Sequence, residues 1–135
     1  MKITVEALVR APIETVWRSW TTPEHIMQWN AASDDWHTTN SVVDLRPGGQ
    51  FSSRMEAKDG SMGFDFAGNY TQIEPMSFIA ATFGDRAIEV TFLPNEDGVL
   101  VRETFDPETE NPIEMQRAGW QAILDNFKRH TETLI

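Results

Sequence analysis

Glu103 is the carboxylate whose place in the sequence most suggests chemistry, because it interrupts an apolar strand pattern. If Asn95 and Gly98 close the preceding turn, Glu103 lies opposite Val90 on a face whose other members are apolar. A buried carboxylate is costly unless it is paired, so Glu103 would act there as a polar anchor or as a general acid or base. The alternative is that the strand end is hydrated or that a bulge turns Glu103 outward. We favour this alternative, because strand register is fragile when it is inferred from sequence.

The three histidines show no spacing that is typical of metal ligands. His25, His37 and His130 are far apart, and no His-Glu-x-x-His motif occurs. We expect His25 and His130 on helix surfaces. His37 follows Trp36 just before a predicted strand, where the pair would stand at the mouth of a pocket, although packing is the more common role of such a pair. We therefore predict neither a metal site nor a cofactor.

Other signatures of catalysis are missing from the sequence. The chain has no cysteine, which excludes a disulfide framework, a thiolate metal site and a cysteine nucleophile. Pro47-Gly48-Gly49 precedes a predicted strand and lacks the Gly-Lys-Ser/Thr of a phosphate-binding loop. No serine lies in a Gly-x-Ser-x-Gly elbow. Whether the protein is an enzyme is left open by these residues.

The charge of the chain argues against some classes of partner. With 21 acidic and 11 basic residues the net charge is −10, which would repel a phosphate backbone, so we expect no nucleic-acid binding. No apolar run approaches about 20 residues, and the first residues lack the apolar core of a signal peptide. We therefore expect a cytoplasmic protein without a membrane span.

The elements that position these residues are a strand, two short helices, about six strands and one long helix. Alternation over residues 3–9 predicts the first strand. Apolar residues at 13, 16, 17 and 20 predict a helix after Pro12, and Thr22-Pro23-Glu24 begins a second helix that ends near Trp29. The later strands are predicted at residues 41–45, 50–57, 62–73, 77–83, 87–93 and 99–106.

The longest predicted helix closes the chain. Asn111 is expected to cap it, with Pro112 at its first position and Glu114 as a capping-box acid. About 20 residues at 1.5 Å each give a rod of about 30 Å. Strands with one apolar face and one long amphipathic helix predict a single α+β domain over residues 1–135, in which a curved antiparallel sheet wraps around the C-terminal helix.

One hairpin allows its register to be worked out. With Asp59-Gly60 as a two-residue loop, Met55 pairs with Phe64. On the opposite face Arg54 then lies across from Asp65, an ion pair that contributes under about 1 kcal/mol if it is exposed. The apolar residues and the opposite charges are both consistent with this register.

Several segments follow one another in a recognisable order. They are Ala-Pro-Ile-Glu-Thr-Val-Trp at 11–17, Thr-Pro-Glu at 22–24 with Gln-Trp at 28–29, Arg-Pro-Gly-Gly-Gln-Phe at 46–51, the stretch from Gly68 to Pro75, and Gly119-Trp120 with Leu124. The series resembles the activator of heat-shock-protein-90 ATPase homologue family, within the START-like (SRPBCC) superfamily. The resemblance implies a helix-grip fold with a cavity for lipid-like or polyketide-like ligands. It implies no single function, because the superfamily also contains cyclases, hydroxylase subunits and carriers.

We therefore expect a ligand-binding protein that holds a small apolar or aromatic molecule in a hydrophobic cavity under the long helix. The expected contacts are Trp36, His37, Met55, Phe64, Phe66, Phe92, Glu103, Trp120, Leu124 and Phe127. Two alternatives stay open. One is a cyclase- or dehydratase-type enzyme that uses Glu103 and His37 as acid and base. The other is a chaperone ATPase co-regulator that acts through its acidic surface, and a homodimer also stays open.

Overall fold

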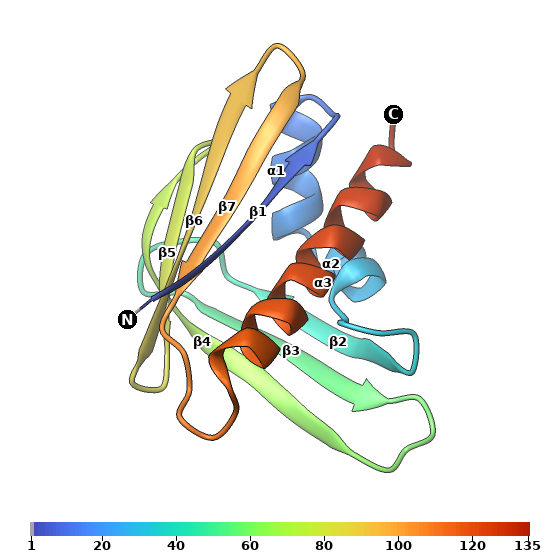
Figure 1. Cartoon of the computed structure of the whole chain (residues 1–135). Helices are drawn as coiled ribbons and strands as arrows, with labels where there is room; N and C mark the ends of the chain where they lie inside the picture. Colours follow the sequence, from blue (N-terminus) through green and yellow to red (C-terminus); the bar gives the residue numbers. More distant parts are fainter. Residues whose placement is uncertain (1) are drawn as a thin grey trace.

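The computed structural model of this chain describes residues 2–135. Its strands are β1 (Ile3–Val9), β2 (Trp36–Val43), β3 (Gln50–Ala57), β4 (Gly63–Glu74), β5 (Phe78–Phe83), β6 (Arg86–Asn95) and β7 (Gly98–Phe105). Its helices are α1 (Ile13–Thr21), α2 (Pro23–Trp29) and α3 (Ile113–Glu132). The strands form one antiparallel sheet in the order β1-β7-β6-β5-β4-β3-β2, and α3 lies across its concave side (Figure 1). The predicted architecture is confirmed.

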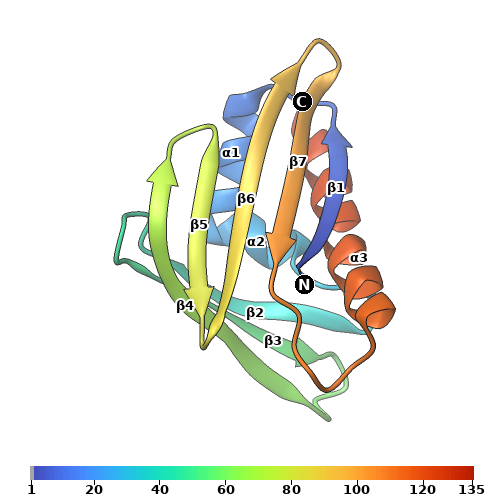
Figure 2. The ribbon, with the colours of Figure 1, turned by 60° about the vertical axis from the view of Figure 1, so that its left-hand side comes forward.

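The sheet is strongly curled. β1, β7, β6 and β5 stand on one side, while β2 and β3 cross beneath α2 and α3 (Figures 1 and 2). Register shifts between Thr38 and Asn40 and between Tyr70 and Gln72 interrupt the ladders, and such bulges increase bending and twist. Gly68 lies at the same bend, where a Cβ atom would come within 2.0 Å of a backbone oxygen of β5. Only glycine allows β4 and β5 to approach this closely.

The strand registers follow the tight turns. Met55 lies opposite Phe64, and Arg54 lies opposite Asp65 with their side chains 3.5 Å apart, as the Asp-Gly turn predicts. β6 and β7 also pair in the expected register, without a bulge, which fixes Glu103 on the inward face. A slip of one residue would turn every side chain to the opposite face, so burial of the apolar set enforces the register.

Some boundaries differ from the predicted ones. β2 begins at Trp36 rather than at residue 41, so His37 lies within the strand and not before it. Pro112 occupies the N-cap of α3 in an extended conformation, with φ −58° and ψ 146°, which leaves Asn111 outside the cap. Thr22 is the N-cap of α2, but its side chain makes no capping hydrogen bond. Fixed proline torsions, rather than capping side chains, therefore set the start of α3.

Helix α3 is held in place at both faces. It packs along β1 and against α1 and α2. Leu124 and Phe127 are completely buried, and the Thr131 hydroxyl donates to the Ser19 hydroxyl of α1 over 2.8 Å in the interior. The Lys128 ammonium donates to the backbone oxygen of Leu8 in β1 over 2.7 Å. These contacts fix the C-terminal half of α3, and its N-terminal half extends over the curl of the sheet.

Candidate ligand-binding site

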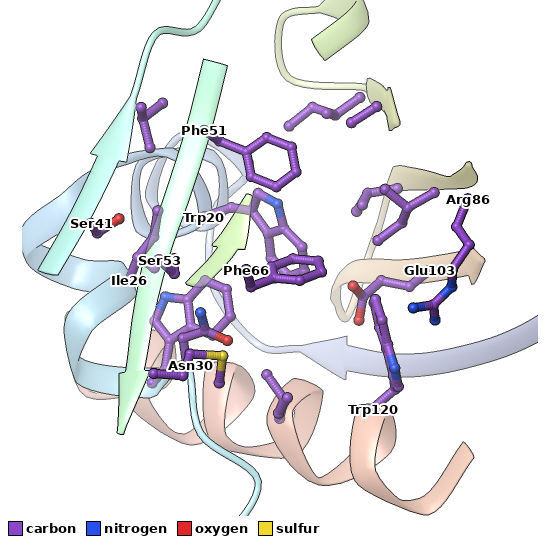
Figure 3. A pocket seen from close by; sticks show the side chains of 18 of the residues that line it. Trp20, Ile26, Asn30, Ser41, Phe51, Ser53, Phe66, Arg86, Glu103 and Trp120 are labelled. Carbon is purple, nitrogen blue, oxygen red and sulfur yellow. The ribbon is translucent and has the colours of Figure 1, made fainter. Parts of the chain in front are cut away.

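A pocket of about 410 Å³ lies between the curled sheet and helices α2 and α3 (Figure 3). Most of its lining is apolar or aromatic. The sheet contributes Phe51, Met55, Phe64, Phe66, Ile79 and Val90, and the helices contribute Trp20, Ile26, Trp29, Trp120 and Ile123. Val42 and Phe64, which also line the pocket, are about half exposed.

Small side chains on the inward face of the sheet account for the empty volume. Ser41 on β2, Ser53 on β3 and Ala81 on β5 all face inward and all are buried. The inward residues next to these three are larger, so the inner surface of the sheet has a depression at these positions. Neither a serine nor an alanine reaches far enough to touch α3, and the space between remains open.

Trp120 forms a rigid wall where α3 passes over the sheet. Its ring stacks on Phe105 with the centroids 3.8 Å apart and the planes 15° from parallel. Phe66 meets the same ring edge-on at 6.1 Å, and Phe83 lies 6.3 Å away. Offset and edge contacts of this kind stabilise aromatic clusters beyond their buried area. The indole is therefore fixed in position before any ligand binds.

Glu103 is the buried acid of this pocket. It is 5% exposed, and its carboxyl group points into the open space beside Trp120 (Figure 3). Burial raises the pKa of Glu103 to about 8, and no hydrogen bond or charged neighbour among residues 2–135 offsets that effect. The neutral acid therefore predominates at pH 7. The bulge that our favoured interpretation of the sequence would use to turn Glu103 outward is absent, because β7 pairs with β6 without interruption and its alternate residues are buried.

Arg86 lies on the same side of the pocket as Glu103 (Figure 3). Its Nε donates to the backbone oxygen of Asp106 over 3.0 Å, and its guanidinium carbon lies 4.5 Å above the centre of the Phe83 ring. The cation is thus held by a carbonyl and an aromatic face. It contributes nothing to the pKa shift of Glu103, which remains without an ion-pair partner in the described chain.

A second polar region lies on β2 and β3. The Ser41 hydroxyl is buried and has no hydrogen-bond partner among residues 2–135, and Ser53 lies directly opposite it in the ladder. Tyr70 also lines the pocket, and burial together with the nearby Asp44 carboxylate raises the pKa of Tyr70 to about 12. The phenol therefore stays protonated at physiological pH.

Of the ten residues predicted to contact a ligand, the structure brings together five on the wall of the pocket. These are Met55, Phe64, Phe66, Glu103 and Trp120. Four of them follow from the inward faces that the two hairpin registers define, and the fifth follows from the apolar face of the long helix.

Phe92, Leu124 and Phe127 do not line the pocket, which corrects the expectation that they would. All three are buried in the packed core. The ring of Phe92 lies edge-on to Trp17 at 5.3 Å, and the ring of Phe127 lies 4.8 Å from Trp20. Trp17 and Trp20 of α1 therefore cover the rings of Phe92 and Phe127.

Trp36 and His37 also lie outside the pocket lining. The Trp36 ring is 5.9 Å from that of Phe64, near the far end of β3 and β4. His37 pairs with Glu56 across the β2–β3 ladder. The structure therefore does not bring His37 to Glu103, and the acid–base pair considered for an enzyme is not assembled. The early start of β2 explains the difference, because it places His37 in a strand rather than in a loop.

Trp20, Ser41, Ala81 and Arg86 also line the pocket, and none of them was predicted as a site residue. Ser53 lies two residues before Met55, so the register set by the Asp-Gly turn places both on the inward face. A small polar residue on that face was the signal that could have identified the polar part of the pocket. Arg86 gave no signal, since its position depends on a carbonyl twenty residues away. No group of three or more metal-binding side chains occurs between residues 2 and 135. None of the helices described is long and apolar enough to cross a membrane.

A curled antiparallel sheet closed by a C-terminal helix over a pocket defines the helix-grip, START-like class. The chain belongs to the family described as Activator of Hsp90 ATPase homolog 1-like protein, whose model matches residues 10–132. Among functionally curated proteins, none matches this chain.

Solved structures of similar proteins agree with this assignment. An AHSA1-like protein from Aeromonas hydrophila is 49% identical, with 99% of this chain and 94% of that one covered and a TM-score of 0.93. A protein from Cytophaga hutchinsonii is 48% identical over 98% of this chain and 93% of that one, with a TM-score of 0.84. A protein from Nitrosomonas europaea shares the fold at 19% identity, with 100% and 96% covered and a TM-score of 0.87.

Proposed function

We propose that this protein binds a small apolar or aromatic ligand, lipid-like or polyketide-like, in the pocket beneath α3. The observation that carries the proposal is the volume of about 410 Å³ behind a mostly apolar lining. Pockets that hold small organic molecules commonly span about 300–1,000 Å³ and have few polar groups. Membership of a helix-grip family supports the same conclusion. A cytoplasmic location and the oligomeric state stay predictions.

Binding would be driven by removal of apolar surface from water. Each Å² of apolar surface buried contributes about 25 cal/mol. The wall is already ordered, since Trp120 is stacked on Phe105 and Phe66 packs against both Phe51 and Phe83. A preformed wall reduces the entropy lost on binding. The site therefore suits a rigid ring system better than a flexible chain of equal area.

Tryptophan fluorescence tests the proposal directly, because Trp20, Trp29 and Trp120 line the pocket. Titration with a panel of hydrophobic ring compounds should quench or shift the emission. Ala81→Leu fills the pocket from β5, and its matched control is Ala80→Leu, whose side chain points to the opposite face of the same strand. We expect Ala81→Leu to weaken binding at least tenfold and Ala80→Leu to leave it unchanged. No response to any compound, or equal binding by both variants, would contradict the proposal.

The same pair of variants separates the alternatives. A chaperone ATPase co-regulator would act through its acidic surface, so Ala81→Leu would leave its association with a chaperone intact. A cyclase- or dehydratase-type enzyme would lose turnover together with binding. No histidine among residues 2–135 lines the pocket beside Glu103 to act as its acid–base partner, and for this reason we put forward binding as the function.

A further inference from the structure

The pocket carries polar groups on two separate walls with an apolar stretch between them. Ser41 and Ser53 stand on one side, and Glu103 stands on the other (Figure 3). The rings of Phe51 and Phe66 form an apolar stretch between these two walls in the same view. Further polar side chains also line the pocket, namely Asn30, Tyr70, Arg86, Glu108, Asn111 and Gln116.

The serine wall is short of a hydrogen-bond partner. The Ser41 hydroxyl is completely enclosed, and none of the residues from 2 to 135 satisfies it. Ser53 is opposite Ser41 in the ladder, and both side chains face the pocket, so the two hydroxyls form one polar patch. Buried polar groups are almost always paired in native proteins, and an orphan group is costly. A ligand oxygen that meets the Ser53 hydroxyl would also remove that cost if Ser41 rotates its hydroxyl toward the pocket.

The opposite wall also carries a polar group without a protein partner. Glu103 is 5% exposed and faces the open space, and no donor, acceptor or cation in the described chain meets its carboxyl group. Because burial raises the pKa of Glu103 to about 8, the group at pH 7 is an acid that can donate its proton in a hydrogen bond. Arg86 lies on the same side of the pocket, but its guanidinium is already held by the Asp106 carbonyl and the Phe83 ring, and the net charge of −10 disfavours an anionic ligand.

The two walls are far apart along the sheet. β4, β5 and β6 lie between β3 and β7, so four strand spacings separate Ser53 from Glu103. At about 4.8 Å per spacing, the path along the sheet is about 19 Å, and the straight line across the curl is shorter. A ligand that reaches both walls must extend past the rings of Phe51 and Phe66, which lie between them in Figure 3.

We propose that the ligand is an elongated, uncharged aromatic or polycyclic molecule with an oxygen function at each end. One oxygen bonds with the Ser41–Ser53 patch, and the other accepts a hydrogen bond from Glu103. The ring system between them lies against Phe51 and Phe66. This inference rests on the proposed function, and it adds the position and chemistry of the polar groups to it.

A graded set of probes tests the inference: biphenyl, 4-phenylphenol and 4,4′-dihydroxybiphenyl, titrated against the tryptophan fluorescence. We expect the dihydroxy compound to bind tightest and biphenyl weakest, with each hydroxyl improving the dissociation constant roughly three- to tenfold. Equal affinities, or weaker binding with each added hydroxyl, would overturn the inference and leave the proposed function standing.

Variants assign each end of the probe to its wall. The double substitution Ser41→Ala and Ser53→Ala should abolish the gain from the second hydroxyl without changing the affinity for biphenyl. Ser52→Ala, on the opposite face of β3, is the matched control and should behave like the wild type. Glu103→Leu should remove the gain at the other end, and Glu103→Gln, which keeps a donor, should retain most of it. A gain that persists in both the double variant and Glu103→Leu would overturn the inference.

Two further outcomes separate this inference from the proposed function. If none of the three probes binds while other apolar ring compounds do, the two-ended ligand is ruled out and the pocket remains a binding site. If no compound binds and Ala81→Leu behaves like the wild type, the proposed function fails and this inference fails with it. Thermal unfolding of each variant, followed by circular dichroism, checks that a loss of binding is not a loss of folding.

Discussion

The burial of Glu103 makes the stability of the protein depend on pH. The unfolded chain loses this proton near the usual pKa of 4.5, whereas the folded protein holds it to about 8. The stability that goes with the neutral carboxyl is therefore complete below pH 4.5 and is lost as the pH rises toward 8. A shift of this size amounts to about 3 kcal/mol between pH 5 and pH 8.

Glu103→Gln should flatten this dependence. We expect the variant to be more stable than the wild type at pH 8, by on the order of 3 kcal/mol, and nearly equal to it at pH 5. Urea unfolding at several pH values measures the difference. The matched control is Glu89→Gln, an exposed acid on the neighbouring strand β6. If Glu103→Gln tracked the wild type across this range, the carboxyl group would be hydrated and the buried position would be in error.

The orientation of Glu103 also shows where residue-level reasoning from sequence falls short. Alternation placed it on the inward face, yet the cost of a lone buried carboxyl argued for turning it out. That cost is accepted here because the adjacent Val101 and Phe105 are completely buried and hold β7 in register. The free-energy cost of burying one acid is smaller than the stabilisation gained by burying the whole inward face of β7. The sequence alone does not give the relative size of these two terms.

Helices α2 and α3 meet at a pair of histidines that no sequence spacing indicated. The Nδ1 atom of His25 lies 3.0 Å from the Nε2 atom of His130, so one of the two donates a hydrogen bond to the other. Both rings are half-buried rather than on open helix surfaces. Partial burial and the neighbouring His25 lower the pKa of His130.

This pair should weaken the protein in mild acid. Because the pKa of His130 is lower in the folded state, the stability from its neutral form is present above pH 6.5 and is lost as the pH falls below it. His130→Gln should reduce the loss of unfolding free energy between pH 7 and pH 5.5. Thermal unfolding at those two pH values measures it, with His37→Gln on β2 as the control. An equal loss in His130→Gln and the wild type would argue against the pair.

The bend between β4 and β5 depends on one glycine. A Cβ atom at Gly68 would come within 2.0 Å of a backbone oxygen and within 3 Å of the Phe51 ring, whereas one at Gly119 in α3 would meet nothing within 4 Å. Gly68→Ala should therefore cost about 2–4 kcal/mol by overpacking and strand displacement. Gly119→Ala should add about 0.5–1 kcal/mol of stability by its helix propensity. Urea unfolding compares the two, and equal effects would contradict the close approach at Gly68.

The hairpins were predictable and the edge strand was less so. The Asp59-Gly60 turn alone fixes β3 against β4, because a two-residue loop leaves one register. β2 has no such turn at its start, and its first residues, Trp-His-Thr-Thr-Asn, lack a clear alternation. Its pairing comes from packing against the neighbouring elements β3 and α2 rather than from a tight turn.

At the scale of the whole molecule, the order of the elements was predictable and the empty volume was not. The apolar faces of strands and helix require a sheet that curls over α3. Whether side chains fill the space between depends on how far Ser41, Ser53 and Ala81 stand from the helix. That separation is set by bulges and by the path of the connection into α3, which no local pattern encodes.

Ligand binding should stabilise the entire fold. A ligand at 100 times its dissociation constant adds about 2.7 kcal/mol to the free energy of unfolding. For a chain of 135 residues we expect this to raise Tm by about 10 °C. Differential scanning calorimetry with 4,4′-dihydroxybiphenyl measures the rise, and Ala81→Leu should show none. A similar rise in both proteins would place the ligand outside the pocket.

The most direct test of a ligand site beneath α3 is nuclear Overhauser contacts between a bound ring compound and the methyl groups of the protein. We expect contacts from 4,4′-dihydroxybiphenyl to the methyls of Ile79, Ala81 and Val90, which line the pocket, and none to the buried methyls of Leu124. Contacts confined to surface methyls, or no contacts at a saturating concentration, would contradict the account.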